Sequence, residues 1–279
     1  MLWASILGLF LTGCGGSQDD TPTCTTDADV DVAVIRTITF ARADGDVCTG
    51  FDLDGEVTEL GDSSCGGVDY VDPYGNPGID SALAGLMPVL DSTEAVALEP
   101  IIQDFINAGE ILLLLEMTGR ETDDASCQGF RLLRGSGAPL VGTDDLLLEG
   151  QTLEVDTTAQ SEFVSAQHTD DGAFLAAGFG FQLPIVVFDA DLDLVFEDAV
   201  VRIEEQEDGT FSGWLGGGVP YQGLVDSLLD TNIDSELKEL LPTAVEALAD
   251  LDPDGDGECQ NLSVTLEFDA VRGYVYDAE

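Results

Sequence analysis

Residues 188–215, FDADLDLVFEDAVVRIEEQEDGTFSGWL, decide the predicted fold because they carry two signatures of paired strands. From Phe188 to Leu194 acidic and apolar residues alternate, which indicates a half-buried strand with one wet face. Asp208-Gly209 lies between two strand-like runs and is a strong signal for a tight hairpin turn. We therefore expect an antiparallel meander over residues 130–215.

Further strands are expected on both sides of this meander. The stretch from Val30 to Arg42 alternates loosely, and the stretch from Leu262 to Tyr276 alternates near the end of the chain. Residues 110–117 are apolar on both faces, which is typical of a fully buried strand.

Two helical regions interrupt the strands. The first covers residues 79–106, contains a D-x-x-E capping box at 91–94, and is followed by Gly109 as a natural stop. The second covers residues 221–251, where leucines and valines recur at helical spacing. The sequence therefore predicts an α+β fold, a mostly antiparallel sheet with two helical regions packed against it.

The first residues of the chain have the pattern of a targeting signal rather than that of a folded domain. An apolar run from Met1 ends in Leu11-Thr12-Gly13-Cys14 and is shorter than the ~20 residues of a spanning helix. The stretch resembles the lipobox of bacterial lipoproteins, in which the cysteine is lipidated and becomes the new N-terminus. An ordinary secretory peptide and a buried strand are the alternatives.

The resemblance to uncharacterised lipoproteins of Gram-negative bacteria implies a membrane anchor at Cys14 and a place in the outer membrane. It makes residues 1–13 a lipoprotein signal peptide. Residues 14–28 are small, polar and acidic, and we expect them to be a disordered tether. Residues 29–279 are then expected to form a single globular α+β domain.

The chain carries 56 acidic against 8 basic residues, a net charge of -48. Such a surface repels nucleic acid and anionic headgroups, so we expect no nucleic-acid partner. Adaptation to salty surroundings explains part of this charge, since salt screens self-repulsion. Some of the acids are also expected to bind cations.

Six cysteines fit an oxidising compartment. If Cys14 is lipidated, five remain for disulfides. Cys48 and Cys65 flank one Asp/Gly-rich loop and could close it, while Cys127 and Cys259 lie in other acidic loops and could pair. Cys24 is then left over, although it could equally take Cys48 or Cys65.

The strongest candidate site is Asp252-Pro253-Asp254-Gly255-Asp256-Gly257-Glu258. It resembles the D-x-D-x-D-G calcium loops of EF-hands, dockerins and thrombospondin type 3 repeats. The resemblance implies side-chain ligands at Asp252, Asp254 and Asp256 and a backbone oxygen at Glu258. The motif's twelfth position holds Ser263 instead of an acid, and a solvated acidic loop is the alternative.

A second, weaker candidate is Asp52-Leu53-Asp54-Gly55, with Asp52 and Asp54 as calcium ligands. Asp69, Asp72, Asn76 or Asp80 could complete it. Asp80 is better explained as a helix N-cap, and the stretch 72–78 has turn chemistry.

Enzymatic motifs are absent from the sequence. His168 is the only histidine, and there is no G-x-S-x-G, H-E-x-x-H, phosphate-loop or dinucleotide fingerprint. A glycosidase-type acid pair depends on three-dimensional spacing. Trp214 and Tyr221 flank glycines 216–218, where they could form a sugar platform or, more commonly, pack in the core.

We therefore expect a non-enzymatic, lipid-anchored cell-envelope protein with a structural or binding role and acidic loops stabilised by Ca²⁺. Its expected partners are the membrane, through the lipid, and an envelope protein or glycan. A calcium-dependent adhesion or carbohydrate-binding module is the alternative, and an extracytoplasmic hydrolase using an acid pair is the second.

Overall fold

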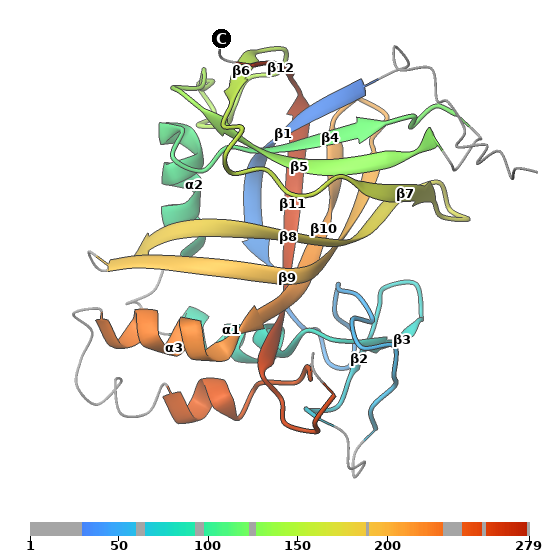
Figure 1. Ribbon diagram of the computed structural model, residues 1–279, viewed down its shortest axis with the longest axis vertical. Helices are drawn as coiled ribbons and strands as arrows, with labels where there is room; N and C mark the ends of the chain where they lie inside the picture. Colours follow the sequence, from blue (N-terminus) through green and yellow to red (C-terminus); the bar gives the residue numbers. More distant parts are fainter. Residues whose placement is uncertain are drawn as a thin grey trace, which may run out of the picture.

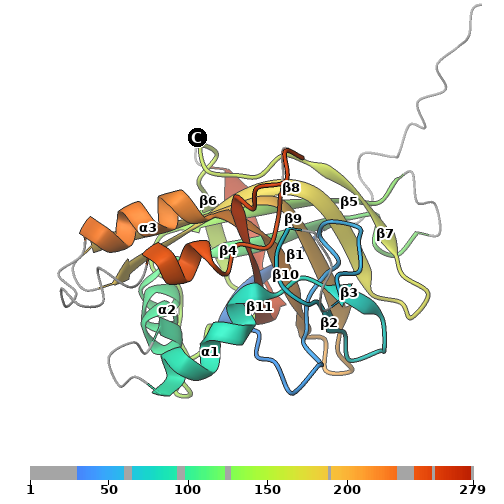
Figure 2. The same ribbon diagram turned by 90° about the horizontal axis from the view of Figure 1, so that it is seen from below.

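The computed structural model describes residues 30–59, 65–92, 98–122, 127–187, 190–230, 242–252 and 255–277, and strands dominate it (Figures 1 and 2). The strands are β1 (Val30–Phe40), β2 (Tyr70–Val71), β3 (Pro77–Ile79), β4 (Leu113–Thr118), β5 (Gly129–Ser136), β6 (Thr152–Val155), β7 (Val164–His168), β8 (Phe174–Val187), β9 (Ala190–Glu205), β10 (Phe211–Pro220), β11 (Asn261–Arg272) and β12 (Tyr274–Asp277).

Eight of these strands form a closed antiparallel β-barrel. The sheet runs in the order β12-β6-β5-β4-β1-β11-β10-β9-β8-β7, and β7 also pairs with β5, which closes the ring. β6 and β12 extend the sheet outside the ring and pair in parallel. β2 and β3 form a separate two-stranded sheet.

The expected α+β fold is wrong. The helices are α1 (Ala82–Ser92), α2 (Leu98–Ala108), α3 (Tyr221–Asp230) and a short turn of helix at 242–246. In Figure 1, α1 and α3 lie at the lower end of the barrel and α2 lies beside it, so they form no layer over a sheet. A closed sheet buries its apolar face against itself and needs no helical layer to cover it.

Several local predictions are confirmed. The hairpin at Asp208-Gly209 joins β9 to β10, with Gly209 at φ 84° and the Gln206 N–H donating to the Thr210 carbonyl. Gly109, at φ 82°, ends α2. The meander is present as consecutive antiparallel pairs from β7 to β10. Phe188 and Asp189 lie outside the described residues.

The core fills the barrel with aromatic and branched side chains. Phe130, Phe174, Phe196 and Phe211 are among its largest fully buried members. α2 contacts both β1 and β8, and it presents Ile102 and Ile106 to the core, four residues apart and therefore on one face of the helix. The helix thus packs against two strands that do not pair with each other.

In the described part of the chain, no helix is long and apolar enough to cross a membrane.

We expect Ile102→Ala to lower the free energy of unfolding by about 2–5 kcal/mol, because a side chain 0% exposed leaves a cavity that packing cannot refill. Asp104→Ala on the exposed side of the same helix is the matched control and should change little. Denaturant unfolding followed by circular dichroism measures both. Equal effects of the two substitutions would show that α2 does not anchor the core.

Candidate cation site

The acidic loops predicted as metal sites gather around β2 and β3, at the lower right of Figure 1. The loop at residues 51–55 reaches β3 through a single antiparallel bridge, in which the Asp80 N–H donates to the Phe51 carbonyl at 2.9 Å. Gly78 permits this approach. It has φ 85°, and a Cβ there would lie 2.9 Å from the Glu56 carbonyl oxygen. Any other residue at position 78 would push the loop away.

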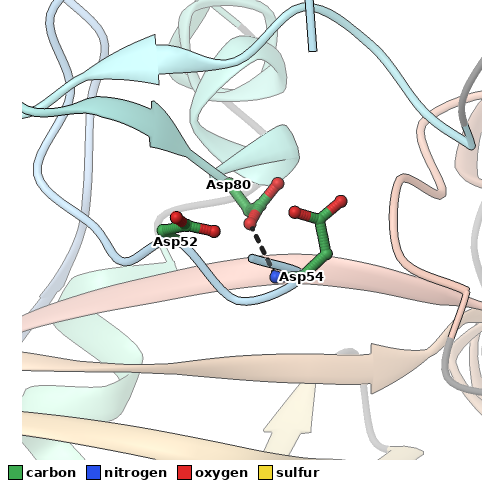
Figure 3. Close-up of side chains that lie close together, drawn as sticks. All are labelled: Asp52, Asp54 and Asp80. Carbon is green, nitrogen blue, oxygen red and sulfur yellow. Dashed lines mark hydrogen bonds between the residues drawn. The ribbon is translucent and has the colours of Figure 1, made fainter. Parts of the chain in front are cut away.

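Asp52, Asp54 and Asp80 converge in this corner, a group that we call the acidic triad (Figure 3). One carboxylate oxygen from each lies within 4.8 Å of the other two. Asp80 follows β3 and is only 3% exposed, whereas Asp52 and Asp54 sit exposed on the loop. Three carboxylates thus face one another, with one of them removed from solvent.

Backbone N–H groups hold the triad in place. Asp80 Oδ2 accepts hydrogen bonds from the N–H groups of Leu53 at 2.6 Å and Asp54 at 3.3 Å. Asp52 Oδ1 accepts from Gly55 at 2.7 Å. The expectation that Asp80 caps a helix is therefore wrong, because its carboxylate accepts hydrogen bonds from a loop 27 residues earlier in the chain.

Burial raises the pKa of Asp80 to about 8, more than the hydrogen bond from Leu53 lowers it. The charges of Asp54, Asp250 and Asp69 contribute to this raised pKa. Burial also raises the pKa of Asp250 to about 6, although Asp250 accepts hydrogen bonds from the Ser263 N–H and hydroxyl. The pKa of Asp69 is raised by burial and by the charges of Asp54 and Asp52. The corner favours a bound proton or cation over bare carboxylates.

Five arginines of the described chain form ion pairs elsewhere. These pairs are Arg42–Glu99, Arg120–Asp31, Arg120–Glu205, Arg131–Glu116, Arg202–Asp171, Arg202–Glu204, Arg272–Asp31 and Arg272–Glu205. Each of them lies outside the triad. Oxygen ligands without an ion-paired arginine among them form a donor set suited to a hard cation.

The 252–258 loop is shaped by its own backbone. Asp252 accepts hydrogen bonds from the Gly255 N–H at 2.9 Å and the Gly257 N–H at 2.6 Å, and Asp256 accepts from the Glu258 N–H at 3.0 Å. Asp254 lies outside the described residues. Calcium binding by Asp252, Asp254, Asp256 and Glu258 therefore stays a prediction.

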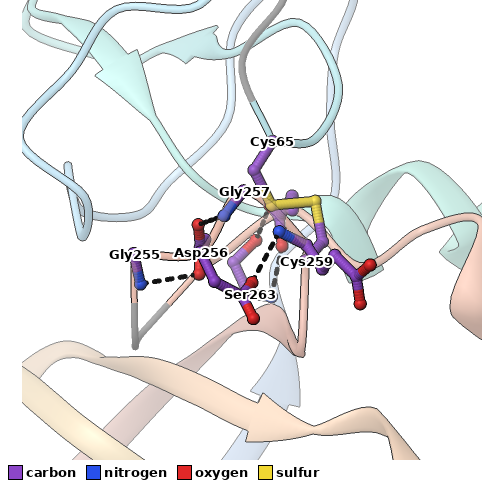
Figure 4. Close-up of a disulfide and its surroundings, with 9 residues drawn as sticks. Cys65, Gly255, Asp256, Gly257, Cys259 and Ser263 are labelled. Carbon is purple, nitrogen blue, oxygen red and sulfur yellow. Dashed lines mark hydrogen bonds between the residues drawn. A yellow bond between two sulfur atoms is a disulfide. The ribbon is translucent and has the colours of Figure 1, made fainter.

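A disulfide joins this loop to Cys65 (Figure 4). Cys65 and Cys259 are bonded across a sequence separation of 194 residues, with their Cα atoms 5.4 Å apart. Next to Cys65, Gly66 lies so close to Asp250 that a Cβ would come within 2.7 Å of the Asp250 Cα. The disulfide thus brings the two predicted acidic loops into one region.

All four pairings considered from the sequence differ from the structure. Cys48 is a free thiol, 1% exposed, so it is bonded to neither Cys65 nor Cys24, and Cys65 is bonded to Cys259 and not to Cys24. Cys127 is disulfide-bonded, but not to Cys259, which is taken by Cys65. Cys14 and Cys24 lie outside the described residues. The spacing of the cysteines along the sequence could not reveal the pairing, since the pairing depends on which distant segments the folded barrel brings together.

The remaining candidates have structural partners. Asp72 closes its own turn by accepting from the N–H groups of Tyr74 and Asn76, both at 2.8 Å. His168 ends β7 with its Nε2 at 2.6 Å from the Arg120 carbonyl. Trp214 has its ring contacts with Phe51 and Tyr74, at 6.2 and 6.0 Å between centroids, and the predicted partner Tyr221 instead begins α3.

Trp214 and Tyr74 lie in a groove of about 400 Å³ on the outer face of the barrel, together with Glu204, Glu267 and Asp269. The three carboxylates already contact protein groups. Glu204 binds Arg202, Glu267 accepts from the Thr49 hydroxyl, and Asp269 accepts from the Thr37 hydroxyl. Arg202 also lies over both aromatic rings. The groove therefore gives the glycan alternative no specific support.

Comparison of the chain with protein-family models, with curated proteins and with solved structures found no match. The chemistry of the chain's own residues is therefore the basis for assigning a function.

Without divalent cations, the melting temperature should fall as the pH rises from about 4 to about 8. The folded chain keeps a proton on Asp250 up to about pH 6 and on Asp80 up to about pH 8, while the unfolded chain, with ordinary carboxyl pKa values, has already released both. The folded state therefore binds more protons and loses stability as they are removed. Asp80→Asn should flatten this slope, and Asp104→Asn should not. An unchanged slope in Asp80→Asn would contradict the raised pKa.

Proposed function

We propose that the protein is a non-enzymatic, lipid-anchored component of the bacterial cell envelope, whose acidic loops are stabilised by Ca²⁺ bound at Asp52, Asp54 and Asp80. One observation carries the calcium site. Asp80 is 3% exposed and faces two further carboxylates within 4.8 Å. A divalent cation offsets this repulsion and allows Asp80 to ionise near neutral pH.

The donor set favours calcium over other metals. All three side chains offer oxygen, which suits hard cations and not metals that prefer thiolate or imidazole. Ca²⁺ accepts irregular sets of six to eight oxygens at distances of about 2.3–2.6 Å, so carbonyls and water could complete the shell. Mg²⁺ demands near-octahedral geometry. Two of the carboxylates sit on an exposed loop that can adjust to the ion.

The lipid anchor is supported by the sequence. Leu11-Thr12-Gly13-Cys14 has the form of a lipobox, and a polar acidic stretch follows it. An envelope location agrees with the disulfide between Cys65 and Cys259, since such bonds persist outside the reducing cytosol. The net charge of -48 agrees with an environment rich in cations.

Saturating Ca²⁺ should raise the melting temperature by about 5 °C or more relative to chelator, because a ligand that binds only the folded state stabilises it. Asp80→Asn and Asp54→Asn should abolish the rise. Asp256→Asn, in the second acidic loop, separates the two candidates and should keep it. Equimolar Mg²⁺ should have a smaller effect. A melting temperature that is the same with Ca²⁺ and with chelator would overturn the proposal.

Mass spectrometry of the mature protein should find acyl groups on Cys14 as its N-terminal residue, because the lipobox directs cleavage before a lipidated cysteine. Cys14→Ser should release the protein from membranes into the soluble fraction. The calcium-dependent rise in melting temperature should persist in this variant, since the two features are independent. An unmodified Cys14 in membrane-bound protein would contradict the anchor.

A further inference from the structure

The barrel has an opening beside its closing seam, the short pairing of β5 with β7. β7 pairs with β8 as far as Ala166 opposite Ala176. Continued in the same register, Ser161 would lie opposite Phe181. Ser161 instead turns to β5, where its N–H donates to the Leu132 carbonyl at 2.8 Å and its hydroxyl accepts from the Leu132 N–H at 2.9 Å. Figure 1 shows the coil before β7 running between β5 and β8. The segment 158–161 thus leaves β8 and follows β5.

β8 is shaped to match this opening. Its pairing with β9 shifts register on both sides of Phe179, at Gly178 and Gly180. Gly178 has φ 82°, and on the neighbouring strand Asp198 has φ 47°, a conformation that non-glycine residues seldom adopt. In the described part of the chain, β8 beyond Ala176 has a strand partner only on the β9 side. Bulges and strained residues of this kind concentrate beside binding sites.

A cavity of about 570 Å³ lies behind the opening. Its apolar floor consists of Leu113, Leu132, Leu133, Phe179, Phe181 and Phe196. The rings of Phe181 and Phe196 are stacked, with centroids 4.3 Å apart and planes 11° from parallel. The volume falls in the range of small-molecule sites.

The rim of the cavity selects against anions. Gln160 on one lip and Gln182 on the other offer uncharged hydrogen-bonding groups. Glu197 and Asp198 outnumber Arg134 at the rim, and the whole chain is strongly negative. An acid would meet repulsion on entering, whereas an uncharged molecule would meet none. A peptide strand that paired with the free edge of β8 would have to displace residues 158–161, which lie on the β5 side of that edge.

We propose that this cavity binds an uncharged, apolar small molecule, which enters between residues 158–161 and 178–182 and packs against the stacked rings of Phe181 and Phe196. The site is separate from the acidic triad and does not depend on bound calcium.

The test is fluorescence titration of the full chain with two probes that share one ring system, neutral N-phenylnaphthylamine and its sulfonated analogue anilinonaphthalene sulfonate. We expect saturable, one-to-one binding of the neutral probe and binding of the sulfonated probe at least about tenfold weaker. No saturable binding of the neutral probe, or equal affinity for the two probes, would overturn the proposal.

Ala159→Trp places a large side chain at the exposed lip of the opening and should weaken neutral-probe binding by about tenfold or more. Gln182→Trp blocks the opposite lip and serves if the first variant does not fold, which circular dichroism would show. Ala138→Trp is the matched control, because Ala138 is exposed but does not line the cavity. Unchanged binding in a folded lip variant would place the probe elsewhere and refute the assignment.

Discussion

The pairing of β5 with β7 is the constraint on which the rest of the structure depends. Only two residue pairs make it, Gly129 with Ser165 and Phe130 with Val164. Beside these pairs, the ring of Phe163 fills the space that a side chain at Gly129 would take, with Phe163 Cζ 2.1 Å from where a Cβ would stand. Without this contact the strands would form an open sheet with two exposed edges. A seam this short also explains why the wall opens immediately beside it.

Charge is distributed unevenly over this frame. Arg120 and Arg272 share Asp31 and Glu205 in a network next to the ring of Phe211. The loops around β3 gather carboxylates of raised pKa instead, with Asp80 the most perturbed. The fold thus contains one region whose charges are satisfied by arginines and another that favours a proton or a cation.

The local elements were predictable from the sequence, because each rests on neighbouring residues. Asp208-Gly209 marks a hairpin and Gly109 a helix end by their own conformational freedom. Barrel closure was not predictable, since it depends on contacts such as Gly129 with Phe163 that leave no periodic signal. The same holds for Asp80, whose carboxylate binds the backbone of Leu53, and for Tyr74, which reaches Trp214 across the fold. Asp52 and Asp54 were identified, but the buried third member was assigned to a helix cap.

The bond between Cys65 and Cys259 also has a consequence for the order of folding. Strands β1 and β11 lie outside the covalent loop that it closes, on short tails at either side. Thr37 and Asp269 are 232 residues apart along the chain, yet the path between them through the bridge is only about forty residues. Once that bridge has formed, pairing of β1 with β11 becomes a contact of low order. Oxidation before collapse would thus give the most distant strand pairing of this barrel a separation comparable with those of β5 with β7 and of β10 with β11.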